Sequence, residues 1–200
     1  MEDSHLIIFI KNPVAGKVKT RLADAIGDEM ALEVYLQLLA ITRVVSENVD
    51  CTRHLFYSDE IESDEWDSDK FNKHVQEGDS LGERMKNAFN QVFALGAKQA
   101  VIIGSDCPKL NSNLVHSAFE ILNEKDVVIG PAKDGGYYLI GMRAPLPFLF
   151  DDKEWSTDTV FEDTVVDLME NRLTYGRLRQ LSDVDTIYDL YLLDGRETRD

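Results

Sequence analysis

The sequence has little cysteine, a deficit of positive charge and no long apolar run, and each shortage argues against a class of protein. Its two cysteines, Cys51 and Cys107, have neither metal-finger nor CxxC spacing, which indicates reduced thiols in a cytoplasmic protein. With 21 basic against 37 acidic residues, the formal charge of -16 argues against a sequence-independent nucleic-acid binder. No apolar run approaches a membrane span, and the first residues lack the basic region of a signal peptide. We therefore expect a cytoplasmic protein without membrane insertion.

What the chain does have is a regular alternation of short apolar runs with helical patterns over 200 residues. Length and composition suit one domain over residues 1–200, and no repeat or linker interrupts it. The alternation predicts a mostly parallel central sheet covered on both faces by helices, a three-layer α/β/α fold. The expected strands are 6–10, 54–57, 100–103, 127–129, 137–142 and 176–179. The expected helices are 29–45, 81–95, 113–122, 159–173 and one after the last strand, and the acidic segment 59–69 is expected to be a solvated loop or a short surface helix.

The most informative segment is the apolar run 101–103, which ends abruptly in Gly104, Ser105 and Asp106. This pattern predicts a buried strand that delivers one carboxylate to its carboxyl end, where open α/β sheets build their sites. A carboxylate there is suited to holding a hard divalent cation against a nucleotide diphosphate. Asp106 could equally cap the helix that Pro108 and the following apolar pattern indicate.

Positive charge is concentrated in one place, the segment that follows the first expected strand. Lys11, Lys17, Lys19 and Arg21 lie within about a dozen residues, on a loop with Pro and Gly between a strand and a helix. Cations and free backbone N–H groups in that position bind phosphate oxygens. The Walker A pattern is absent, and the alternative is a set of solvated lysines on a surface loop.

Two glycine-containing turns are further candidates. In the first, Arg84 falls in the first turn of a helix, although Asp79 or Ser80 could simply cap that helix. In the second, the Asp-Gly-Gly turn at 134–136 joins two expected strands, and glycines there would let a ligand approach the backbone. Asp-Gly is also an ordinary turn dipeptide.

A polar bend precedes the last expected helix. Asp183 and Thr186 are plausible helix caps there, and the alternative is that Asp185 supplies a second carboxylate to a metal held by Asp106.

Together these segments resemble a known family. They read KNPVAGKVKTRL at 11–22, GDSLGERM at 78–85, GSDCP at 104–108, KDGGYY at 133–138 and WSTD at 155–158. In this order they resemble the small bacterial nucleotide-diphospho-sugar transferases of the GT-A fold. The resemblance is strongest to glycosyltransferases of the arsenosugar-biosynthesis type, with 2-phospholactate guanylyltransferase as a more distant relative, and it covers about residues 6–190.

The resemblance implies a role for each matching residue. Asp106 and Asp185 would bind the metal, and Asp134 would face the acceptor or sugar. The residues implied in binding the nucleotide-sugar are Ala15, Gly16, Lys17, Lys19, Arg21, Arg84, Gly104, Ser105, Gly135 and Gly136. The sequence departs from the family in two places, since the first Asp of the DxD element is missing and the late motif reads DTIYDL in place of DTPEDL.

The expected function is transfer of a sugar from a nucleotide-diphospho-sugar to a small-molecule acceptor, dependent on Mg²⁺ or Mn²⁺. Lys19 and Arg21 would stabilise the charge that develops on the leaving phosphate, and Asp134 would orient or deprotonate the acceptor hydroxyl. One alternative is a nucleotidyltransferase that uses a nucleoside triphosphate and a phosphorylated small molecule. Another is a nucleotide-binding module without turnover.

Overall fold

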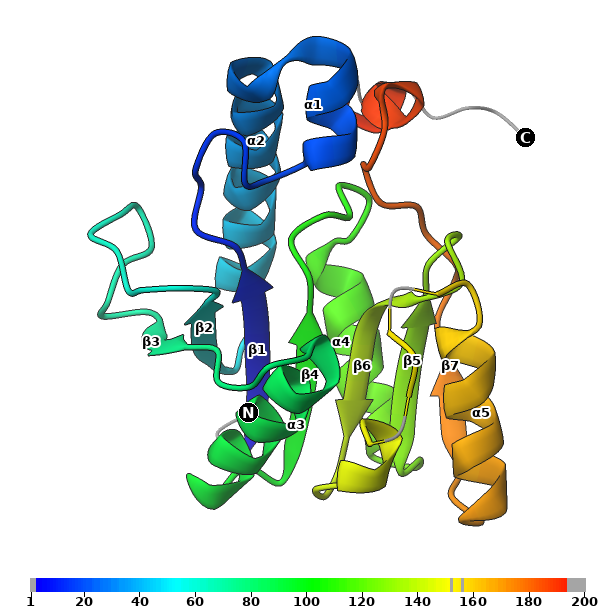
Figure 1. The fold of residues 1–200 in the computed structure, drawn as a ribbon. Helices are drawn as coiled ribbons and strands as arrows, with labels where there is room; N and C mark the ends of the chain where they lie inside the picture. Colours follow the sequence, from blue (N-terminus) through cyan, green and yellow to red (C-terminus); the bar gives the residue numbers. More distant parts are fainter. Residues whose placement is uncertain (1–2, 152, 156, 194–200) are drawn as a thin grey trace.

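The fold is built around one twisted sheet of seven strands (Figure 1), in a computed structural model that describes residues 3–151, 153–155 and 157–193. The strands are β1 (Ser4–Ile10), β2 (Thr52–Tyr57), β3 (Asn72–Val75), β4 (Gln99–Ile103), β5 (Val127–Pro131), β6 (Tyr137–Met142) and β7 (Tyr175–Arg177). Their order across the sheet is β3-β2-β1-β4-β6-β5-β7. Within this sheet β6 alone runs antiparallel to its neighbours, which confirms the predicted mostly parallel sheet.

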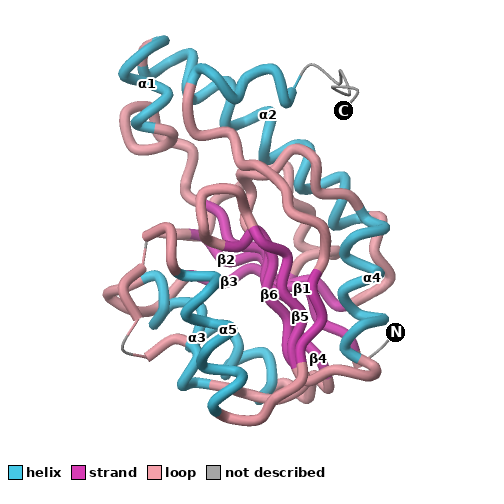
Figure 2. The backbone as a smooth tube through the Cα atoms, turned by 90° about the vertical axis from the view of Figure 1, so that its right-hand side faces the viewer, coloured by secondary structure: helices cyan, strands magenta, loops and turns pink. Residues whose placement is uncertain are grey.

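Helices cover both faces of the sheet, as Figure 2 shows with α4 on one side and α3 and α5 on the other. The helices are α1 (Thr20–Ile26), α2 (Asp28–Glu47), α3 (Leu81–Ala94), α4 (Ser112–Leu122) and α5 (Val160–Glu170), with 3-10 turns η1 (Pro147–Leu149) and η2 (Ile187–Leu193). Among the described helices, none combines the length and apolar character needed to cross a membrane. The three-layer α/β/α prediction is confirmed.

The buried strand β1 shows why both faces must be covered. Its side chains alternate between two hydrophobic cores, because successive side chains of a strand point to opposite faces. Leu6 and Ile8 pack with α2 and α4, whereas Ile7 and Phe9 pack with α3 and α5. A strand buried on both sides therefore appears in the sequence as a continuous apolar run.

The local predictions differ from the structure in four places. The chain contains an additional edge strand, β3, and an additional short helix, α1. The last expected helix is the 3-10 turn η2, and the helix expected over 159–173 ends at Glu170. The acidic segment 59–69 is a loop, but one of its members, Trp66, is buried against Phe71 at a ring distance of 5.0 Å.

Three histidines form a hydrogen-bonded row across strands β1, β2 and β3. His5 Nδ1 lies 2.9 Å from His54 Nε2, and His54 Nδ1 lies 3.1 Å from His74 Nε2. The row ends at Gln91, whose Nε2 lies 3.0 Å from His74 Nδ1. If that amide donates, every following contact joins one N–H to one bare ring nitrogen only when all three rings are neutral. Burial lowers the pKa of His54 to about 3, and it also lowers the pKa of His5 and His74.

The histidine row predicts a loss of stability in acid. The unfolded chain takes up protons near pH 6.5, whereas folded His54 takes one up only near pH 3. The contribution of these histidines to the free energy of unfolding is therefore complete above pH 6.5. It falls as the pH drops toward 3, by up to about 1.4 kcal/mol per pH unit for each histidine whose pKa is lowered in this way. Urea unfolding at pH 7.5 and 5.0 measures this decrease, which should be smaller in His54→Gln. His116→Gln, outside the row on α4, should retain the full decrease, and equal slopes in the two variants would contradict the assignment.

Candidate active site

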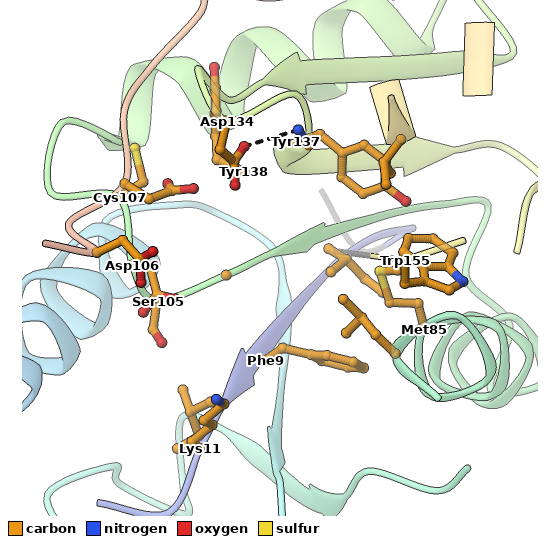
Figure 3. Close-up of a pocket in the computed structure, with 18 of the residues that line it drawn as sticks. Phe9, Lys11, Met85, Ser105, Asp106, Cys107, Asp134, Tyr137, Tyr138 and Trp155 are labelled. Carbon is orange, nitrogen blue, oxygen red and sulfur yellow. Dashed lines mark hydrogen bonds between the residues drawn. The ribbon is translucent and has the colours of Figure 1, made fainter. Parts of the chain in front are cut away.

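One cavity of about 620 Å³ opens at the edge of the sheet where β1 and β4 end and β6 begins. This volume lies within the range of small-molecule sites. Because β1 and β4 are parallel neighbours, their carboxyl ends meet at this edge, and the N–H of Gly104 donates to the carbonyl of Tyr138 on β6. Figure 3 shows side chains from these elements directed into the cavity. The strand-end position that the sequence favours for a site is therefore hollow.

Lys19 is the most deeply placed cation of this cavity. Its side chain is 5% exposed, and its Nζ lies 2.9 Å from Oδ1 of Asp106, whose side chain is 50% exposed. Lys19 immediately precedes α1 and has a φ of 49°, a left-handed conformation that costs a non-glycine residue roughly 1 kcal/mol. Asp106 does not cap α4, because Asn111 takes that position and accepts from the N–H of Leu114.

A second ion pair lies beside the first. Arg21 Nη1 is 2.8 Å from Oδ2 of Asp185, and both side chains are well exposed. The segment around Asp185 is held here because the N–H of Val184 donates to the carbonyl of Asp106. Two of the four cations expected to bind phosphate, Lys19 and Arg21, are thus paired with the two carboxylates expected to bind metal.

Asp183 is an additional carboxylate of the cavity that the sequence analysis treated only as a possible cap. Burial raises its pKa to about 7, with further contributions from Asp106 and Asp134, and Lys19 opposes this rise. The spacing in the sequence could have indicated this role for Asp183. Asp183 and Asp185 flank one apolar residue, Val184, which is fully buried. In an extended segment two residues separated by one apolar residue face the same side.

The turn that carries Asp134 has a structural requirement of its own. Asp134 lines the cavity, and its Oδ1 accepts from the N–H of Gly136. Gly135 has a φ of 91°, and a Cβ on it would overlap the backbone of Asp158. The turn therefore needs glycine at position 135 for conformation and for close approach, while Asp134 faces the cavity.

The structure brings together only part of the predicted site. The predicted residues that line the cavity are Lys19, Arg21, Gly104, Ser105, Asp106, Asp134, Gly136 and Asp185. Those outside its lining are Ala15, Gly16, Lys17, Arg84 and Gly135. Arg84 lies in the first turn of α3 and donates from Nε to the carbonyl of Gly78, while Ser80 caps the helix in a capping box with Glu83.

Two residues that the sequence analysis missed hold the loops of the cavity in place. One is Asn12, whose Oδ1 accepts from the N–H of Asp59 at 3.0 Å and whose Nδ2 donates to the carbonyl of Glu60 at 2.8 Å. The other is Tyr35 on α2. Its hydroxyl accepts from the N–H of Lys11, donates to the carbonyl of Lys11, and lies 3.4 Å from Oγ of Ser105. The loops after β1, β2 and β4 are therefore cross-linked by two polar side chains.

Tyr35→Phe removes these contacts of one hydroxyl without changing the ring. Because it leaves the partly buried backbone N–H and C=O of Lys11 without this partner, we expect a loss of about 1 kcal/mol in unfolding free energy. Nucleotide affinity should fall as well, since Lys11 and Ser105 both line the cavity. Urea unfolding and calorimetry measure the two effects. Tyr188→Phe, an 84% exposed residue, is the control, and an unchanged Tyr35→Phe protein would show that the hydroxyl does not position the loops.

The carboxylates of the cavity are the type of ligand that a hard divalent cation prefers. Asp106, Asp183 and Asp185 all line the cavity, and carboxylate oxygens are the ligands that Mg²⁺ and Mn²⁺ prefer. In the part of the chain that the structure describes, no three His, Cys, Asp or Glu side chains are grouped closely enough to hold a metal ion. Two of these carboxylates, Asp106 and Asp185, contact the side chains of Lys19 and Arg21 in this structure.

The chain is similar to proteins of known fold. Residues 41–157 match a family described as uncharacterized proteins conserved in bacteria, DUF2064. A crystal structure from Desulfovibrio desulfuricans G20, provisionally described as a nucleotide-diphospho-sugar transferase, is 35% identical over 96% of this chain and 87% of that one, with a TM-score of 0.88. A comparison with proteins of curated function found no match.

Two more distant structures share the fold alone. The 4-diphosphocytidyl-2C-methyl-D-erythritol synthase of Anaerococcus prevotii DSM 20548 is 9% identical with a TM-score of 0.61, over 96% of this chain and 94% of that one. A manganese complex of Rv0371c from Mycobacterium tuberculosis H37Rv is 14% identical with a TM-score of 0.53, over 98% of this chain and 100% of that one.

Proposed function

This chain belongs to the DUF2064 family and has the nucleotide-diphospho-sugar transferase fold, and on that premise we propose that it transfers a sugar from a nucleotide-diphospho-sugar to a small acceptor. One observation carries the proposal. The almost fully buried side chain of Lys19 places its ammonium 2.9 Å from Asp106 in a cavity at the carboxyl ends of β1 and β4, in a protein of strongly negative charge. A buried cation in such a protein is suited to an anionic ligand.

Lys19 and Arg21 are the proposed ligands of the donor diphosphate. As the bond from sugar to phosphate breaks, negative charge grows on the leaving diphosphate, and both cations would stabilise it. Because each is now paired with a carboxylate, binding would exchange a carboxylate partner for a phosphate partner.

Asp106 and Asp185 are the proposed ligands of Mg²⁺ or Mn²⁺, with Asp183 beside them in the same cavity. When bound, the ion would supply further positive charge against the diphosphate oxygens. The phosphates would draw Lys19 and Arg21 away, and the freed carboxylates would then be available to the ion.

Asp134 is the proposed group that orients the acceptor hydroxyl or takes its proton. It lines the cavity on a turn fixed by its own hydrogen bond to Gly136, so its second oxygen is free to face a substrate. Asp134 lies on the turn between β5 and β6, whereas Lys19 and Arg21 lie at the start of α1.

The proposal is tested by identifying the product. A thermal-shift series of nucleotides and nucleotide-sugars, with and without Mn²⁺, first selects the donor, because a ligand of the folded protein raises its melting temperature. Incubation of that donor with candidate acceptors should then release a nucleoside diphosphate. Release of pyrophosphate from a nucleoside triphosphate would instead identify a nucleotidyltransferase, and binding without any turnover would favour a nucleotide-binding module.

A further inference from the structure

The cavity has two ends of different chemistry. The carboxylates and the paired cations described above line one end. Figure 3 shows a second group, Phe9, Met85, Tyr137 and Trp155, gathered apart from Asp106 and Cys107. We refer to these four residues as the aromatic end. Its walls come from β1, α3, β6 and the segment after η1, so four parts of the chain converge on it.

The walls of the aromatic end are held by packing. The rings of Tyr137 and Trp155 meet edge to face at 6.4 Å, and Trp155 stacks on Phe150 at 6.2 Å. The indole of Trp155 also lies directly on Gly82 of α3, where a Cβ would overlap its Nε1. Gly82, the second glycine of the GDSLGERM segment, therefore leaves room for this ring. Its indole N–H faces the helix and is not directed at the cavity.

One polar atom of the aromatic end has no partner. The hydroxyl of Tyr137 is buried and, across the described residues, is the only buried side-chain nitrogen or oxygen without a hydrogen bond. The neighbouring Tyr138 differs, because its hydroxyl donates to the carbonyl of Arg179 at 3.0 Å. Burial raises the pKa of Tyr137, so its hydroxyl stays protonated and remains a donor. An unpaired buried hydroxyl costs about 1 to 3 kcal/mol, which calls for a physical reason.

We propose that the aromatic end binds a mostly apolar ring of the acceptor, which carries an oxygen that accepts a hydrogen bond from the Tyr137 hydroxyl. That this ring belongs to the acceptor of the transfer rests on the proposed function. A sugar or a nucleobase fits these four side chains poorly, since each ligand carries several polar groups and the four side chains offer one unpaired hydroxyl. The ring inserts between Tyr137 and Trp155 and reaches the covered hydroxyl by displacing the indole edge, with the reacting group of the acceptor directed toward Asp134.

The test uses benzyl alcohol, which has a ring and one oxygen, and toluene, which has the ring alone. The protein carries Trp66→Phe, so that Trp155 is the remaining one of the two tryptophans and its fluorescence reports ring binding. We expect saturable binding of both probes. Adding Tyr137→Phe should weaken benzyl alcohol about 2- to 10-fold, the range of one neutral hydrogen bond, and leave toluene unchanged. The melting temperature of the Tyr137→Phe protein should not fall, because the Tyr137 hydroxyl has no hydrogen-bond partner to lose.

Tyr188→Phe, at an exposed tyrosine of η2, is the matched control and should change neither affinity. Absence of saturable binding, or equal weakening of both probes by Tyr137→Phe, would overturn the inference. Calorimetry of nucleoside diphosphates on the same protein separates it from the proposed function. Nucleotide binding without ring binding overturns the inference about the aromatic end alone. Ring binding without nucleotide binding supports the aromatic end and overturns the proposed function.

Discussion

Asp106→Asn is expected to lower the rate of transfer by about 100-fold or more. The change removes one negative charge from the group that pairs with Lys19 and that we propose as a metal ligand. The cation would then lose a ligand, and the charge on the leaving diphosphate would be less well stabilised. Measured with saturating donor, the loss should appear in kcat as well as in kcat/KM, because the interaction strengthens as charge develops on the leaving group.

The same variant should also be less stable. It leaves the 5% exposed side chain of Lys19 without its closest carboxylate, although Asp106 itself is half exposed. We therefore expect a loss of about 1 to 3 kcal/mol, less than for a fully buried pair. Asp24→Asn makes the same change of charge on an exposed residue of α1 and should alter neither activity nor stability. Transfer by Asp106→Asn at the unaltered rate would contradict the assignment.

Lys19→Ala is expected to weaken a nucleoside diphosphate by about 10- to 150-fold, equivalent to the 1.5 to 3 kcal/mol of a hydrogen bond to a charged group. The unphosphorylated nucleoside should bind as before, because the proposed contact is to phosphate. Calorimetry with both ligands measures the difference between them.

The chain offers a matched control for this change. Lys17 lies on the same loop and has the same charge, but it is not among the residues that line the cavity. Lys17→Ala should leave both affinities within about 2-fold. Equal losses for nucleoside and diphosphate in Lys19→Ala would indicate a loop with a structural role only.

The periodic parts of the fold were predictable because burial controls their sequence. Strands β1 and β4 are covered on both faces, so they appear as continuous apolar runs. Strand β3 was missed because it lies at the edge of the sheet, where Asn72, Lys73 and His74 remain partly accessible. Helix α1 was missed because it has seven residues and begins after Lys19, whose side chain makes no cap.

The site was predictable to the extent that strand ends mark it. Asp106 follows directly from the end of a buried strand, and the basic loop stands out against the acidic composition. Tyr35 could not be found in this way, since its partners Lys11 and Ser105 lie 24 and 70 residues away and meet it only in the folded sheet. Tyr137 was predicted only as the first residue of a strand, because a missing hydrogen bond has no sequence pattern.

Whether the cavity binds the diphosphate of an activated nucleotide is tested most directly by a crystal structure of the protein with a nucleoside diphosphate and Mn²⁺. We predict diphosphate oxygens within hydrogen-bond distance of Lys19 Nζ and the Arg21 guanidinium, with the 2.9 Å contact between Lys19 and Asp106 replaced by these new partners. A nucleotide bound elsewhere, with the pair of Lys19 and Asp106 intact, would contradict the proposed site.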